Sequence, residues 1–181
     1  AEQTGRAMIE LERVMQELCP DVVLVYGDTN TTLATGLAAA KLKIPFGHVE
    51  GGPRTYDRGE PEEINRLVAD HLAKWNFCPD EISVANLARE GIVEGVLHVG
   101  DVMYDAFLMF RDRAKCKSTL TQQHGLPRNR FALVTFHRPY NTDEAAAAAD
   151  IVEIVRRLKS MVALPLHPRT EAALRRHGLY E

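Results

Sequence analysis

Short apolar runs rich in β-branched residues alternate with longer amphipathic stretches along this chain of 181 residues. Parallel strands need a crossover connection, usually a helix, so this alternation is typical of parallel sheets with helices on both faces. It predicts the α/β class, with Rossmann-like, doubly wound parallel sheets. The predicted strands are residues 22–26, 44–49, 75–78, 96–99, 131–136 and 162–166, the predicted helices are residues 8–18, 33–42, 62–73, 82–90, 102–117 and 143–161, and the predicted loops include 50–61 and 167–170.

The pattern weakens between residues 115 and 130, where the sequence is polar and contains turn formers such as Gly125 and Pro127. We interpret this segment as a connection between two domains, residues 1–114 and residues 131–181. The second domain has only two predicted strands, which are too few for an independent doubly wound sheet. The chain also starts in helix-like sequence without an initiator Met. We therefore expect a chain truncated at both ends, with an incomplete second domain.

The charge of the chain argues against a nucleic-acid partner. The formal net charge is −3 and the sequence pI is about 6.2, so there is no basic field to attract a phosphate backbone. The three cysteines lack the spacing of a zinc site and the density of a disulfide scaffold, as expected in a reducing compartment. No apolar run approaches the roughly 20 residues that span a bilayer. We expect a cytoplasmic protein with no membrane partner and neither a metal nor another cofactor.

Polar side chains follow several predicted strands at the point where each strand ends. Asp28 follows the first strand, His48 and Glu50 end the second, and the pair His137 and Arg138 follows the first strand of the second domain. Glu62 opens the helix after the long loop. In open parallel sheets, ligands bind beyond the carboxyl ends of the strands. We therefore expect these residues to converge on one crevice between the two domains.

Each candidate also has a purely structural interpretation. Asp28, beside Thr29, is equally suited to cap the following helix. Glu62 and Glu63 are common first-turn acids, because negative charge is favourable near a helix N-terminus. Glu50 is harder to explain in this way, since it follows an apolar strand directly and precedes two glycines with exposed backbone. No pair of His, Asp or Glu has the spacing of a metal site.

A series of short motifs runs from one end of the chain to the other. They are EQTG at 2–5, PDVVLVYGDTNTTLA at 20–34, IPFGHVEGGPRT at 44–55, PEEINR at 61–66, EGI at 90–92, GDVMYDA at 100–106, VTFHRPYN at 134–141 and LHPRT at 166–170. Their order and spacing resemble the non-hydrolysing UDP-N-acetylglucosamine 2-epimerases of bacterial surface-polysaccharide synthesis. The chain departs from that family at Gly51 and Pro53, where alanine and leucine are common.

The resemblance implies two Rossmann-like domains that face each other across a deep cleft, as in the glycosyltransferase B architecture. It implies an enzyme, usually homodimeric, that interconverts UDP-GlcNAc and UDP-ManNAc by eliminating UDP to give 2-acetamidoglucal and then adding it back. By the same resemblance the catalytic residues are Asp28, Glu50, Glu62 and His137, and the substrate-binding residues are Arg54, Arg66 and Arg138.

Other functions stay open at this point. The hydrolysing relatives release free ManNAc and UDP, and a non-catalytic protein could use the same acids only to hold a nucleotide sugar. A glycosyltransferase of the same architecture is disfavoured by the carboxylates in HVEGG and PEEINR. The family's first strand and its later UDP-binding segment fall outside residues 1–181. We therefore expect the chain alone to be inactive or nearly so.

Overall fold

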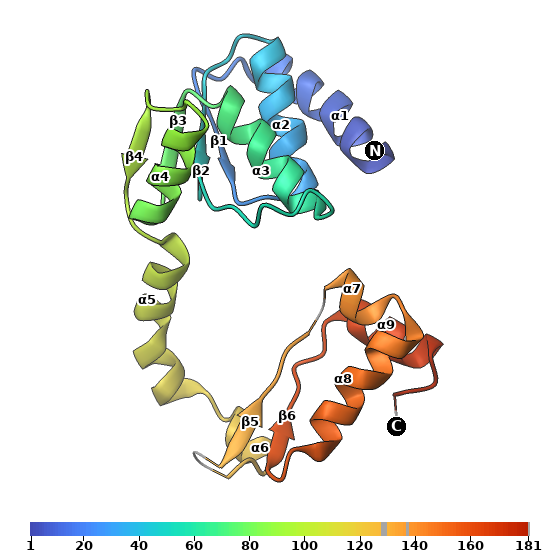
Figure 1. Cartoon of the computed structure of the whole chain (residues 1–181). Coiled ribbons are helices and arrows are strands. Elements are labelled where there is room, and N and C mark those ends of the chain that lie inside the picture. Colours follow the sequence, from blue (N-terminus) through green and yellow to red (C-terminus); the bar gives the residue numbers. More distant parts are fainter. Residues whose placement is uncertain (128–129, 137, 181) are drawn as a thin grey trace. The chain divides into compact units, whose positions relative to one another are not determined.

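The computed structural model describes residues 1–127, 130–136 and 138–180, and the chain forms two compact units, residues 1–111 and 112–181 (Figure 1). The first unit contains α1 (Glu2–Leu18), β1 (Val23–Tyr26), α2 (Asn30–Lys41), β2 (Phe46–Val49), α3 (Pro61–Leu72), β3 (Trp75–Cys78), α4 (Glu81–Arg89), β4 (Val96–His98) and the start of α5 (Val102–Lys117). The second contains α6 (Leu120–Gln123), β5 (Phe131–Leu133), α7 (Pro139–Thr142), α8 (Ala145–Arg157), β6 (Met161–Ala163) and α9 (Pro168–Arg176).

The sheet of the first unit has the order β1-β2-β3-β4, and every neighbouring pair is parallel. Tyr26 pairs with Val49, and Val49 pairs with Phe77, so the strands end close to one another along the sheet. The helices α2, α3 and α4 are the crossovers that parallel pairing requires. The expected parallel α/β architecture is confirmed, and it gathers the turns after β1 and β2 at one sheet edge.

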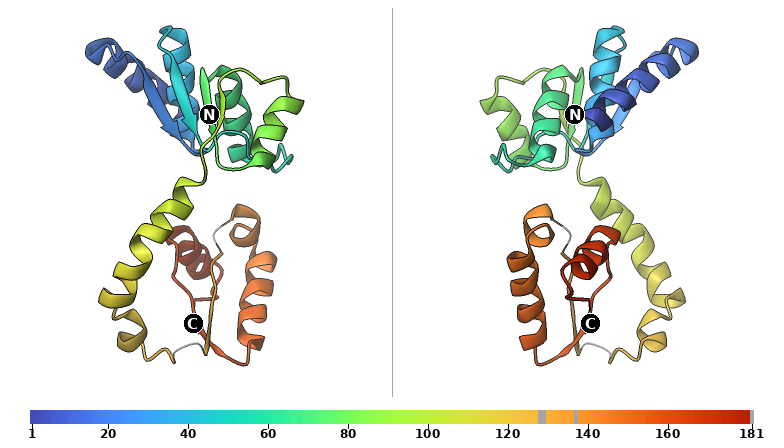
Figure 2. Two further views of the ribbon diagram at one scale, coloured as in Figure 1. Left: turned by 90° about the vertical axis from the view of Figure 1, so that its left-hand side faces the viewer. Right: turned by 90° about the vertical axis from the view of Figure 1, so that its right-hand side faces the viewer.

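A small hydrophobic core anchors this sheet. Met15 of α1, Ala38 and Ala39 of α2, and Val25 and Phe46 of the strands form its buried centre. The small side chains of α2 let the helix approach the sheet closely, and α1 packs beside α2 (Figure 2). Phe46 is 1% exposed. Burial of such a side chain stabilises the fold by about 1.5–3 kcal/mol.

Within the described residues, the sheet of the second unit is one parallel pair, β5 and β6, whose connection contains α7 and α8. Its strands are shorter than predicted. The structure has Phe131–Leu133 and Met161–Ala163 where strands 131–136 and 162–166 were expected. The predicted helix 143–161 is Ala145–Arg157. The segment 115–130, expected to connect two domains, holds the end of α5 and the short helix α6.

The prediction of a loop at 167–170 was wrong, because α9 begins there. The His167 side chain caps the helix by accepting a hydrogen bond from the Arg169 amide at 3.1 Å, and Pro168 occupies the first turn, where its missing N–H is not needed. Thr170 is fully buried and donates to the Phe136 carbonyl at 2.6 Å, which ties α9 to the segment after β5. None of the helices in the described part of the chain is long and apolar enough to cross a membrane.

Candidate active site

The turns that follow β1 and β2 lie against each other, and they carry Asp28 and Glu50. The Gly27 amide donates to the Val49 carbonyl at 3.0 Å, which joins the two turns. Oε2 of Glu50 lies 3.3 Å from the position that a Cβ atom on Gly27 would occupy. The structure therefore brings Glu50 beside the turn of Asp28, at the sheet edge where ligands of open parallel sheets bind.

Asp28 points to helix α3 and does not cap α2. The cap of α2 is Thr29, which accepts from the Thr32 amide at 3.4 Å, so the capping interpretation of Asp28 is wrong. Oδ2 of Asp28 instead accepts hydrogen bonds from Nε and Nη2 of Arg66 at 3.0 and 2.6 Å. The Asp28 side chain is 34% exposed, whereas that of Arg66 is 10% exposed. Asp28 is thus held by a nearly buried cation and keeps access to solvent.

The neighbouring acids Glu62 and Glu63 have different environments. Glu63 is 2% exposed and accepts from the backbone amides of Thr55 and Tyr56 at 3.0 Å each, and from Nη1 of Arg66 at 3.0 Å. Burial alone would raise the pKa of Glu63, but these donors outweigh burial and hold that pKa below its ordinary value. Glu63 therefore fixes the loop before α3. Glu62, which was expected to be catalytic, is half-buried in the first turn of α3.

Arg66 lies between two carboxylates. It pairs with Asp28 at 2.6 Å and with Glu63 at 3.0 Å. Since one guanidinium balances two acids here, the local charge is negative before Glu50 and Glu62 are added. Arg66, expected to bind substrate, is engaged in orienting these acids.

Arg54, also expected to bind substrate, lies inside the protein. Its side chain is 0% exposed and pairs with Asp70 and with Glu90 at 2.7 Å each. Burial alone would lower the pKa of Arg54, but the hydrogen bonds and charges of Glu90 and Asp70 outweigh it and hold that pKa above its ordinary value. His48, also fully buried, lies 2.6 Å from Asp70. This buried network holds residues 50–54, here called the Glu50 turn, in place.

The backbone of Glu50 itself is unusual. Its φ is 70°, in the left-handed region, which costs a non-glycine residue roughly 1–3 kcal/mol. The amides of Glu50 and Gly51 donate to the Phe77 carbonyl at 3.1 and 3.2 Å. The surrounding contacts thus keep Glu50 in a conformation that it would not adopt alone.

The candidates of the second unit are less fully described. His137 lies outside the described residues. Arg138 is half-buried, and its carbonyl accepts from the Asn141 amide at 3.0 Å and from the Thr142 hydroxyl at 3.1 Å. These bonds close the first turn of α7.

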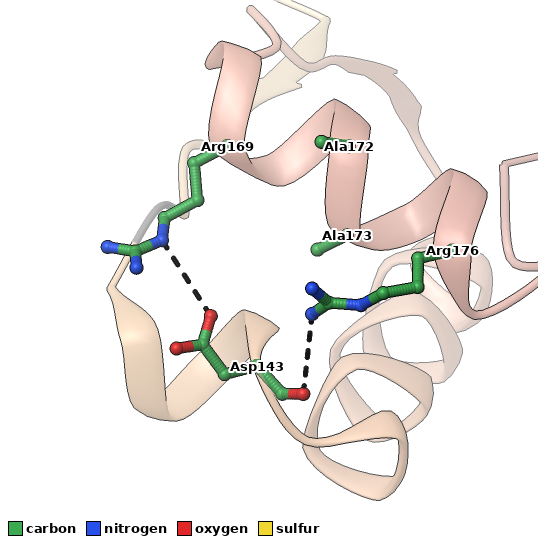
Figure 3. A pocket seen from close by; sticks show the side chains of 5 residues that line it. All are labelled: Asp143, Arg169, Ala172, Ala173 and Arg176. Carbon is green, nitrogen blue, oxygen red and sulfur yellow. Dashed lines mark hydrogen bonds and ion pairs between the residues drawn. The ribbon is translucent and has the colours of Figure 1, made fainter.

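A depression of about 360 Å³ lies on the second unit, lined by Asp143, Arg169, Ala172, Ala173 and Arg176 (Figure 3). Arg169 lies 3.7 Å from the Asp143 carboxylate, and Arg176 donates to the Asp143 carbonyl at 3.5 Å. Both guanidinium groups therefore join α9 to the segment between α7 and α8. Within the described residues, no group of three or more His, Cys, Asp or Glu is placed to hold a metal ion.

Two residues of the buried network, Asp70 and Glu90, are absent from the candidates chosen by sequence. A signal for Asp70 existed in the chain. Residues 63, 66 and 70 recur at helical spacing and share a face of α3 with the buried Ala69. A helix that turns charged residues inward indicates a buried polar network.

A model of the UDP-N-acetylglucosamine 2-epimerase family matches residues 1–180. The chain belongs to this family. It is 42% identical over 184 positions to the UDP-2,3-diacetamido-2,3-dideoxy-D-glucuronate 2-epimerase of Pseudomonas aeruginosa, covering 98% of this chain and 51% of that protein. It is 40% identical over 187 positions to the UDP-N-acetylglucosamine 2-epimerase of Methanocaldococcus jannaschii, covering 99% and 51%.

Solved structures of the UDP-N-acetylglucosamine 2-epimerase family agree with this assignment. The crystal structure of the M. jannaschii enzyme in complex with UDP-GlcNAc and UDP has a TM-score of 0.84 and 39% identity, and the match covers 99% of this chain and 51% of that one. The family membership expected from the motifs is thus confirmed. The chain spans about half the length of the relatives it matches.

Proposed function

We propose that this chain supplies the carboxylate cluster of a UDP-N-acetylglucosamine 2-epimerase, an isomerase that interconverts UDP-GlcNAc and UDP-ManNAc. The observation that carries the proposal is the juxtaposition of Glu50 with the turn of Asp28 at one sheet edge. Glu62 follows on α3, whose Arg66 pairs with Asp28. Parallel α/β sheets bind their ligands at such an edge.

The chemistry explains why several carboxylates are needed. The hydrogen at C2 of the sugar has no adjacent carbonyl to acidify it, so the C1–O bond to UDP breaks first and a cation-like sugar forms. Loss of the C2 proton to a base gives 2-acetamidoglucal and UDP. A proton then adds to C2 from the other face and UDP adds back at C1. A base, an acid and negative charge near C1 serve these steps.

The cluster can divide these roles among its members. One carboxylate can act as the base, another as the acid, and a third can supply negative charge near C1. We assign Asp28, Glu50 and Glu62 to this group, with His137 as a further catalytic residue. Arg138 is assigned to the departing phosphate, because a guanidinium binds phosphate oxygens strongly.

We extend the proposal to the domains, oligomeric state and cellular role of the complete protein. Residues 1–114 form most of an N-terminal Rossmann-like domain, and residues 131–181 begin a UDP-binding domain. The complete enzyme is a homodimer of the cytoplasm that serves surface-polysaccharide synthesis. The motifs that run through the chain support these features.

A second substrate is favoured by one observation. The P. aeruginosa relative, 42% identical over 98% of this chain, is named for UDP-2,3-diacetamido-2,3-dideoxy-D-glucuronate. Epimerisation at C2 of that sugar needs the same elimination and re-addition. The two substrates differ at C3 and C6, away from the carbons where bonds break, so the same carboxylates serve both.

Proton NMR of each UDP sugar in D₂O tests the proposal. The full-length protein should produce the C2 epimer with deuterium at C2, and Glu50→Gln should abolish most of this exchange. Glu94→Gln, which removes an exposed carboxylate before β4, is the matched control and should leave exchange unchanged. Free ManNAc with UDP would indicate a hydrolysing enzyme, and no exchange with either sugar would contradict the proposal.

A further inference from the structure

Asp70 of α3 contacts residues that precede and follow Glu50 in the sequence. Asp70 is fully buried, and its Oδ2 accepts from the Gly52 amide at 3.1 Å and from Nη1 of Arg54 at 2.7 Å. Its Oδ1 lies 2.6 Å from Nδ1 of His48. One carboxylate therefore contacts the chain two residues before Glu50, two residues after it and four residues after it.

The same network reaches the turn of Asp28 through His48. Nε2 of His48 lies 2.8 Å from the carbonyl oxygen of Gly27. A carbonyl oxygen only accepts, so Nε2 is the donor of this bond. Gly27 directly precedes Asp28 and lies under the Glu50 carboxylate. The line from Asp70 through His48 to Gly27 thus fixes both turns relative to α3.

We propose that Asp70 is the positioning residue of this site: through His48 and the Glu50 turn, it sets the direction in which Glu50 and Asp28 face the sugar. This inference rests on the proposed epimerase function. Asp70 is fully buried, so it acts through the residues that it holds. The left-handed backbone of Glu50 needs such support, because non-glycine residues rarely adopt it.

The position of the network separates this role from that of an ordinary core ion pair. Arg54 pairs with Asp70 and with Glu90. These two ion pairs would compensate the buried charge of Arg54 wherever they lay in the core, so they do not by themselves indicate a role at the site. The other contacts of Asp70 fall on His48 and Gly52, which flank Glu50. A role in stability alone does not require that arrangement.

Steady-state kinetics of the full-length enzyme tests the proposal. Asp70→Ala should lower kcat about 100-fold, the loss expected from a displacement of roughly 1 Å, and change KM less than about threefold. Asp70→Asn keeps the shape and one acceptor for Gly52 and Arg54, and should restore kcat to within about tenfold of wild type. Asp80→Asn is the control, because Asp80 caps α4 at 2.7 Å and asparagine caps equally well.

A measurement of the folded fraction and a second variant, His48→Asn, complete the test. Circular dichroism gives the folded fraction, by which kcat is normalised. If Asp70→Ala does not fold, His48→Asn replaces it, because asparagine can still donate to Asp70 and loses the bond to Gly27. It should lower kcat about tenfold. Wild-type kcat in a folded Asp70→Ala enzyme, or in His48→Asn, would overturn the proposal.

A crystal structure of the 181-residue chain with Asp70→Ala tests the geometry without any assay of activity. The φ of Glu50 should leave the left-handed region, and an unchanged turn would overturn the positioning role even in an active enzyme. Absence of turnover by the wild-type enzyme on both UDP sugars would instead refute the proposed function, and the geometric result would still decide the role of Asp70.

Discussion

Gly52→Ala offers a quantitative test of how tightly the Glu50 turn is packed. Gly52 has φ of 93°, and a Cβ atom there would lie 2.5 Å from the Ser83 carbonyl oxygen. Gly91 has a similar φ of 80°, but a Cβ atom there would meet nothing within 4 Å. The two substitutions share the backbone strain, and only Gly52→Ala adds a collision with backbone.

The expected magnitudes follow from this difference. The left-handed conformation costs an alanine about 1–2 kcal/mol at either position. Overpacking against an atom that cannot move adds about 1–3 kcal/mol at Gly52. We therefore expect Gly91→Ala to lower the free energy of unfolding by about 1–2 kcal/mol, and Gly52→Ala to lower it by about 2–5 kcal/mol.

Urea unfolding of the 181-residue chain measures both values. Trp75 is the single tryptophan of the sequence and lies in β3, so its fluorescence reports on the first unit. The two midpoints can be compared directly when the slopes of the transitions agree. The reasoning is refuted if Gly52→Ala is no more destabilising than Gly91→Ala, because Ser83 would then have moved aside at no energetic cost.

The remaining predictions use the same unfolding assay. The pKa of Glu63 is lower in the folded state, so its carboxylate adds stability above the ordinary value of 4.5 and loses that contribution as the pH falls through the folded pKa. The difference in free energy of unfolding between wild type and Glu63→Gln should therefore become smaller below pH 4.5, and a difference that does not change with pH would contradict this. Arg66→Met should destabilise by about 3 kcal/mol, because it leaves buried Glu63 without its cation, and Asp28→Asn should cost about 1 kcal/mol or less; equal losses would contradict this. Gly5→Ala in α1, with open space around it, should stabilise by about 0.5–1 kcal/mol, and a loss would show an unseen contact.

The alternation of apolar runs was sufficient to predict the strands of the first unit, because each one is a local pattern. The predicted strand 75–78 coincides with β3, and the predicted strand 22–26 differs from β1 by one residue. The predicted helix 33–42 begins three residues late, since the cap Thr29 was one of several polar residues in that turn. Local signals define an element better than they define its first residue.

The second unit was harder to predict because α9 lacks a broad apolar stripe. Only Ala173 and Leu174 are its buried apolar residues, and its cap is His167, which is not among the usual capping residues. The buried network was missed for a different reason. His48 and Asp70 are 22 residues apart, and Arg54 and Glu90 are 36 apart, so no local pattern identifies the partners.

The adjacent acids Glu62 and Glu63 show that residue type and position in the sequence do not by themselves determine the environment of an acid in the fold. Both occupy the first turn of α3, and the sequence treats them alike. The amides of Thr55 and Tyr56 occupy the oxygens of Glu63, and those amides belong to a loop whose path depends on tertiary contacts. A carboxylate saturated in this way is a poor base, because its donors must be displaced before it can take a proton. The hydrogen-bond partners of Glu63 therefore show that it holds the loop before α3.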